Sequence, residues 1–192
     1  MAKMTDVFKA YEKGSAKERA EIIFNNYCSF LGIIDYWEKR LLYEIELEEQ
    51  FCRSTHKGEL GVRIQRLGNY SDTTAQQAVE NVIIRESIEG NGKLALRDCI
   101  STKEREKLER MHYVLIVMRE EYDSFEKYLY ALMPEEQQII IPFLKHEKDC
   151  GELAQELGVA LGTVYVRISR IRKELLSDME TFFADRITEE TK

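Results

Sequence analysis

The chain has 192 residues and a net charge of −7, and 44% of its residues are hydrophobic. This length allows one or two domains with a sizeable core. We expect no membrane span and no signal peptide, because the apolar runs are short and the first residues mix charged and apolar types. The four cysteines show no paired spacing, so we interpret them as reduced thiols of a cytoplasmic protein and expect no metal site and no cofactor.

The first predicted element is a long helix near residues 16–51. Ser15 and Glu18 have the spacing of a capping box, in which each side chain accepts a hydrogen bond from the other residue's backbone amide. Apolar residues then recur at every third or fourth position, which indicates one buried helix face. These residues are Ile23, Tyr27, Phe30, Ile34, Trp37, Leu41 and Ile45.

Residues 53–73 form the least regular stretch of the chain. Basic residues outnumber acidic ones there, and three glycines disfavour a helix. Two interpretations stay open, a flexible loop and a second basic contact to DNA phosphates. A shorter helix is predicted from residue 74 to about residue 89, followed by a turn at Gly90, Asn91 and Gly92.

A second long helix is predicted over residues 102–132, with another capping-box pattern at Ser101 and Glu104. Its apolar residues alternate at steps of three and four, which is the period of a coiled coil. They are Leu108, Met111, Leu115, Met118, Tyr122, Phe125, Leu129 and Leu132. The aromatic and methionine side chains favour antiparallel pairing of the two long helices, within one chain or between two chains. A simple bundle core and the stalk of a homodimer both remain open.

The most informative stretch is residues 149–176, DCGELAQELGVALGTVYVRISRIRKELL, which has the layout of a helix-turn-helix. Ala154 lets two helices cross closely, and Gly158 can adopt the left-handed conformation that ends the first helix. The second helix carries an apolar stripe and, off that stripe, four basic residues against one glutamate. The stripe consists of Val164, Ile168, Ile171 and Leu175. Such a helix suits the major groove of DNA, although a basic run is also typical of a solvated surface.

The predicted DNA face is the set of polar residues that point away from this apolar stripe. Arg167 occupies the position where ordinary repressor motifs keep an apolar core residue, and here the apolar residue comes one position later, at Ile168. An exposed arginine at that position suggests a use outside the fold. The predicted DNA-binding residues are Thr163, Tyr165, Arg167, Ser169, Arg170 and Lys173.

Residues 132–176 resemble region four of bacterial sigma factors. The segment MPEEQ is similar to that family's proline-led entry, GELAQELGV to its first motif helix, and GTVYVRISRIRKEL to its recognition helix. The one-residue shift to Ile168 is typical of the sigma-like subset of these motifs. No counterpart of sigma region two is evident upstream, so the resemblance does not imply a complete sigma factor.

The rest of the chain looks more like phage-encoded sigma-like regulators of the ArpU and RinA type. These proteins join a helical N-terminal part to a region-four-like motif, and YSDTTAQQAVENV (residues 70–82) is similar to a segment often found between their helices. The resemblance implies a phage or prophage late-gene activator that acts with RNA polymerase.

The helical patterns themselves predict an all-α chain in three parts. The first part is a helical hairpin or coiled-coil-like N-terminal domain over residues 1–132, which includes the basic loop near residues 53–73. The helix-turn-helix domain follows over residues 133–181, and an acidic tail over residues 182–192 ends the chain.

Two residues depart from the sigma pattern. Ala160 stands where family members usually have a serine that caps the recognition helix, and the loss of a capping bond typically costs about 1 kcal/mol. Pro142 lies in the helix before the motif, eight residues after Pro134. It removes an amide donor and crowds the carbonyl of Gln138, so we expect a kink or break near Ile141.

The sequence shows no phosphate-binding glycine loop and no serine or cysteine nucleophile beside a histidine, so we do not expect this protein to be an enzyme. Three functions remain. The first is a sequence-specific transcription regulator that binds double-stranded DNA through a local basic helix, despite the acidic balance of the whole chain. The second is a phage packaging protein of the small-terminase type, for which a closed ring of subunits would be diagnostic. The third is a helical interaction protein whose motif serves only packing.

Overall fold

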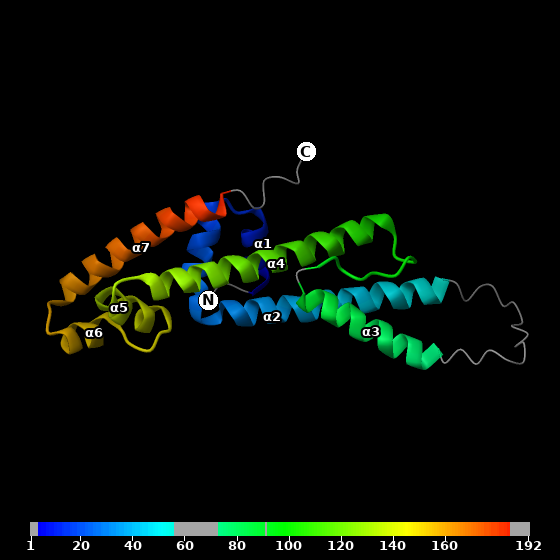
Figure 1. Ribbon diagram of the computed structural model, residues 1–192, viewed down its shortest axis with the longest axis horizontal. Helices are drawn as coiled ribbons and strands as arrows, with labels where there is room; N and C mark the ends of the chain where they lie inside the picture. The colour runs from blue at the N-terminus through cyan, green and yellow to red at the C-terminus, as the bar shows by residue number, and fades with distance from the viewer. Residues whose placement is uncertain (1–3, 56–72, 91, 185–192) are drawn as a thin grey trace, which may run out of the picture. The chain divides into compact units, whose positions relative to one another are not determined.

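A computed structural model describes residues 4–55, 73–90 and 92–184, and in this part of the chain it shows helices and no β-strand (Figure 1). The all-α class predicted from the sequence is confirmed. In chain order the helices are α1 (Met4–Lys13), α2 (Ala16–Thr55), α3 (Thr73–Glu89), α4 (Thr102–Ala131), α5 (Pro134–Leu144), α6 (Cys150–Leu157) and α7 (Leu161–Phe183).

The chain divides into two compact units. The first unit combines Met1–Ile34 with Val117–Lys192, and the second unit is Asp35–Ile116. Helices α2 and α4 each contribute to both units. The domain boundary expected at residue 132 lies inside the first unit, where α4 ends and α5 begins. The reason is that α1 and the start of α2 pack together with the C-terminal helices.

Helix α2 follows the predicted pattern closely. All seven residues of its predicted apolar stripe are buried. At its start the amide of Ser15 donates to Glu18 Oε2 over 2.7 Å and the amide of Glu18 donates to Ser15 Oγ over 3.4 Å, so the capping box is confirmed. The helix continues to Thr55, beyond the end predicted near residue 51.

In the second unit, α2 and α4 run in opposite directions (Figure 1). Lys107 of α4 lies 3.2 Å from the carboxylate of Glu44 on α2. Arg97, in the segment before α4, pairs with Glu49 of α2 at 2.9 Å and with Glu80 of α3 at 2.6 Å. These ion pairs join three segments of the second unit, and they agree with the antiparallel pairing predicted from the sequence.

The apolar series of α4 is buried within the single chain from Leu108 to Leu129, and Leu132 is half-buried. An apolar seam of this kind would need a second copy to cover it only if it were exposed. The chain covers the seam itself, so its burial does not require a homodimer. The homodimer stays a prediction.

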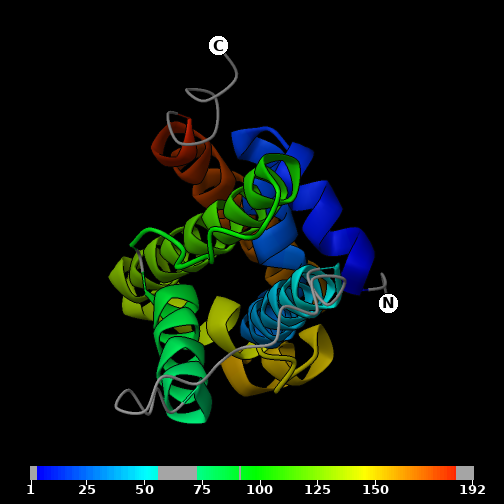
Figure 2. The same cartoon turned by 90° about the vertical axis from the view of Figure 1, so that its right-hand side faces the viewer.

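Aromatic side chains form a cluster in the core of the first unit. Tyr27 and Phe30 of α2 both stack on Tyr122 of α4, with ring centroids 5.5 Å and 5.6 Å apart. The sequence patterns did not predict α1, whose Tyr11 is fully buried with its ring centroid 5.8 Å from that of Phe30. Figures 1 and 2 both place the end of α7 next to the junction of α1 and α2.

Of the kink or break expected near Ile141, the break is wrong. Helix α5 continues through Pro142 and ends at Leu144. The proline stands in the last turn, so only one hydrogen bond near the end of the helix loses its donor. The carbonyl of Ile141 accepts from the amide of Lys145 over 3.0 Å, which closes the final turn.

Several sequence predictions fall on residues outside the described part. These are residues 56–72 of the expected basic loop, Asn91 of the expected turn and residues 185–192 of the expected acidic tail. Among the helices that are described, none is long and apolar enough to cross a membrane.

Candidate nucleic-acid interface

Helix α6 begins at a complete capping box. The carboxylate of Asp149 accepts a hydrogen bond from the amide of Glu152 over 2.8 Å, and the carboxylate of Glu152 accepts one from the amide of Asp149 over 2.8 Å. This arrangement satisfies two backbone donors and fixes where α6 starts. Leu153 and Ala154 of α6 are buried, as the packing of a helix-turn-helix requires.

Gly158 makes the turn between α6 and α7. Its backbone has φ 63° and ψ 31°, the left-handed conformation predicted from the sequence. The amide of Gly158 donates to the carbonyl of Gln155 over 3.3 Å, and the amide of Val159 donates to that of Ala154 over 3.1 Å. This pair of bonds is a Schellman motif, which satisfies two carbonyls at the end of α6 and directs the chain into α7.

The N-cap residue before helix α7 is Ala160, which has extended backbone and makes no side-chain capping bond. The amide of Thr163 instead donates to the backbone carbonyl of Ala160 over 2.8 Å. The first turn therefore lacks the side-chain acceptor that serine would supply, as expected for alanine at this position.

The apolar stripe of α7 is buried as predicted. Val164, Ile168, Ile171 and Leu175 are all buried, and α7 contacts both α5 and α6. The burial continues to Phe183, so the predicted recognition helix is the first part of a longer helix. Tyr128 of α4 donates to Asp178 over 2.5 Å, and burial together with that carboxylate raises the pKa of Tyr128 to about 12.

The predicted DNA-binding residues surround one apolar side chain that the sequence argument passed over. Five of them are exposed and Arg167 is half-buried; the exposed five are Thr163, Tyr165, Ser169, Arg170 and Lys173. Val166 lies three or four positions from Thr163, Ser169 and Arg170 and seven positions from Lys173, which places it among these residues on the same side of the helix. Its side chain is 69% exposed. The signal in the sequence was its position off the buried stripe.

The basic residues of α7 have different surroundings. Arg170 is 3.1 Å from Glu136 of α5 and 3.9 Å from Glu174, so acidic neighbours offset its charge. No ion pair with another described residue is found for Arg167 or Lys173. Arg172 lies on a different side of α7, with its guanidinium carbon 5.1 Å from the centre of the Phe24 ring. The sequence predicted that Arg172 lies off the apolar stripe but did not assign it to the DNA face.

The described residues include no cluster of three histidine, cysteine or acidic side chains that could hold a metal ion. No family model, no curated protein and no solved structure matches this chain. The resemblance to sigma region four therefore rests on the sequence of residues 132–176 alone.

Proposed function

We propose that the protein is a sequence-specific DNA-binding transcription regulator and that α7 enters the major groove. The observation that carries the proposal is the division of α7 into a buried and an exposed side. Val164, Ile168 and Ile171 are buried on the side where α7 packs in the fold, α7 contacts α5 and α6, and the opposite side presents polar, basic and apolar groups to solvent. Helix-turn-helix proteins present their second helix to DNA in this way.

The chemistry of the exposed side suits base reading. Arginine and lysine hydrogen-bond to the acceptor edge of guanine, hydroxyl groups bond to bases or phosphates, and an apolar side chain contacts the methyl group of thymine. Lys173 and Val166 lie near the middle of this side, so they are the central candidates for phosphate and thymine contacts. Arg170 must exchange Glu136 for a DNA acceptor before it contributes.

The biological setting follows from the resemblance to sigma-like phage regulators. We place the activity at phage or prophage late promoters, in the cytoplasm, with RNA polymerase as the protein partner. The proposal works with one copy or with a homodimer, because α7 and its supporting helices belong to one unit of one chain. Light scattering on the purified protein measures which of the two forms exists.

The test is selection of bound duplexes from a random-sequence pool, followed by fluorescence anisotropy. A regulator of this kind enriches a defined motif and binds it at least a thousandfold more tightly than a shuffled duplex at physiological salt, a ratio typical of specific recognition. An unenriched pool, together with equal affinity for all duplexes at low salt, contradicts the proposal. The chain would then be a helical interaction protein whose motif serves packing.

A further inference from the structure

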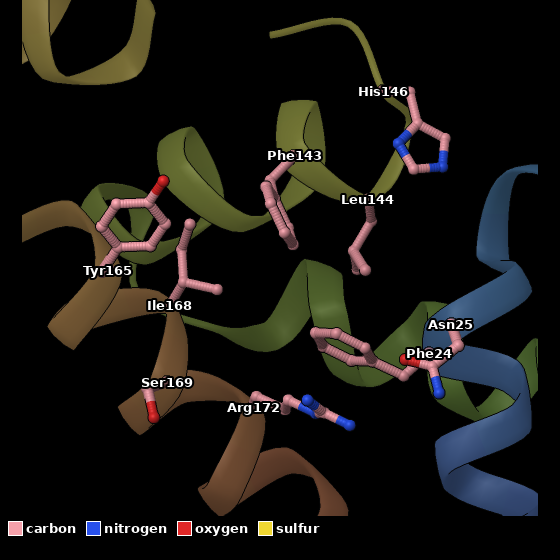
Figure 3. A pocket seen from close by; sticks show the side chains of 9 residues that line it. All are labelled: Phe24, Asn25, Phe143, Leu144, His146, Tyr165, Ile168, Ser169 and Arg172. Carbon is pink, nitrogen blue, oxygen red and sulfur yellow. The ribbon is translucent and has the colours of Figure 1, made fainter. Parts of the chain in front are cut away.

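We propose that a cavity between α2, the end of α5 and α7 is a binding site for a small organic carboxylate with an aromatic or other apolar body. The cavity has a volume of about 360 Å³ and lies entirely within the first unit (Figure 3). Ligand pockets commonly have volumes of about 300–1,000 Å³ and combine apolar walls with a few polar groups. This cavity has both features.

The walls of the cavity are apolar. Phe24 of α2, Leu144 of α5 and Ile168 of α7 are buried side chains that line it, and Phe143 adds a half-buried ring. Figure 3 shows Phe143 and Leu144 on one side of the cavity and Phe24 with Arg172 on the other. A flat apolar group between them would remove water from both sides, and this burial of apolar surface favours binding.

Arg172 determines the charge of the ligand. Its guanidinium is half-buried against the Phe24 ring, and no hydrogen bond or ion pair with another described residue is found for it. The planar group therefore keeps its N–H donors available beside an apolar wall. A carboxylate pairs with a guanidinium through two parallel hydrogen bonds, which fixes orientation as well as charge.

The remaining polar groups favour a monoanion over a phosphate ester. Asn25, Ser169 and Tyr165 line the cavity and add one amide and two hydroxyl groups. His146, which adopts a left-handed backbone with φ 56°, lies at the rim beside Leu144 (Figure 3). One guanidinium matches one carboxylate, whereas a phosphate dianion would need a second permanent positive charge.

The cavity shares two side chains with the predicted DNA face, Tyr165 and Ser169. A bound carboxylate neutralises Arg172 and contacts both, so it weakens DNA binding by α7. This regulatory part rests on the proposed DNA-binding function, whereas ligand binding itself does not. The ligand measurements are therefore made without DNA, so that the failure of either proposal can be recognised separately.

The probes are benzoate, indole-3-acetate and 2-naphthoate, each compared with its primary amide by titration calorimetry on the full chain. We expect saturable binding of at least one carboxylate and at least tenfold weaker binding of its amide. Arg172→Gln should weaken carboxylate binding at least tenfold, and Arg85→Gln, at an exposed arginine of α3, should leave it unchanged. No saturable binding, equal affinity for acid and amide, or equal effects of the two variants would overturn the proposal.

A second variant covers the case in which Arg172→Gln fails to fold. Asn25→Trp fills the mouth of the cavity from an exposed position on α2 and leaves α7 intact. It should abolish carboxylate binding and keep the wild-type melting temperature, and binding that persists would overturn the proposal. For a duplex enriched from the random pool, a saturating carboxylate should weaken the affinity of the wild type and leave that of Asn25→Trp unchanged. Equal DNA affinity of the wild type with and without carboxylate would overturn the regulatory part.

Discussion

The guanidinium of Arg19 lies 2.8 Å from the carboxylate of Glu121 at a position that is almost closed to solvent. The two residues are 102 positions apart in the chain. The hydroxyl of Tyr11 donates to the same carboxylate, and Arg19 also donates to the backbone carbonyl of Phe183 over 2.9 Å. Through these bonds α1, α2 and α4 hold the end of α7 in the first unit.

Replacement of Glu121 should therefore destabilise the protein strongly. Glu121→Gln leaves the buried charge of Arg19 without a counter-ion, and breaking a buried pair in this way costs about 3–5 kcal/mol. The control is Asp35→Asn, which breaks an exposed pair with Lys39 and should cost less than about 0.5 kcal/mol. Urea unfolding measures both, and similar free energies of unfolding for the two variants would show that Glu121 does not hold the fold.

The same network predicts a loss of stability in alkali. Burial and the neighbouring carboxylate of Glu121 raise the pKa of Tyr11 well above its ordinary value of 10.0. The stability that protonated Tyr11 gives the folded chain is fully present below pH 10.0. It is lost as the pH rises from there toward the folded-state pKa, because the unfolded chain releases the proton first.

The matched variant is Tyr11→Phe, which cannot release a proton. Above pH 10.0 its free energy of unfolding should fall less steeply than that of the wild type. Because the two proteins differ by one titrating proton, these slopes should differ by up to about 1.4 kcal/mol per pH unit. Unfolding experiments at a series of pH values give both slopes, and parallel curves for the two proteins would refute a buried, neutral Tyr11.

The sequence predicted the long helices well and the buried charges not at all. The spacing of apolar residues in α2, α4 and α7 predicts which face of each helix is buried, because neighbours three and four positions apart share a helix face. A lone arginine or glutamate carries no such signal, and Arg19 and Glu121 are stable in the interior because they pair with each other and with Tyr11 and the Phe183 carbonyl. Helix α1 was missed because it is short, and its core side chain Tyr11 depends on partners far along the chain.

The candidate site was only partly predictable for a related reason. The stripe of α7 and the turn at Gly158 are local features, and both were predicted. The position of Arg172 over Phe24 is a tertiary contact between residues from opposite ends of the chain, so spacing alone could not show it. Val166 was passed over because an apolar residue in a predicted helix is usually assigned to the core.

Two glycines near the turn should respond oppositely to alanine. A Cβ at either Gly158 or Gly162 would meet no atom within 4 Å, so packing does not separate them. Gly158 has a left-handed backbone, and Gly158→Ala should cost about 1–2 kcal/mol. Gly162 lies in the first turn of α7, and Gly162→Ala should stabilise the protein by up to about 1 kcal/mol. Thermal unfolding gives the melting temperature of each variant. A change of the same sign in both variants would contradict the described turn.

Val166 should read a thymine methyl group if α7 lies in the major groove. Replacing the thymines of the enriched duplex by deoxyuridine removes those methyl groups and leaves every hydrogen-bonding group in place. The wild type should then bind several-fold more weakly. Val166→Ala should bind the thymine duplex more weakly and respond less to deoxyuridine. An equal response of the two proteins, measured by anisotropy, would remove Val166 from the interface.

The most direct test of DNA recognition by α7 is the affinity and salt dependence of Arg167→Ala and Lys173→Ala for the enriched duplex. The matched control is Lys9→Ala, at an exposed lysine of α1. Each α7 variant should lose about 1–3 kcal/mol of binding free energy if its residue reads a base, or lower the salt slope by about 1 if it contacts a phosphate. Lys9→Ala should change neither quantity. Wild-type affinity and wild-type salt slope in both α7 variants would contradict DNA recognition by α7.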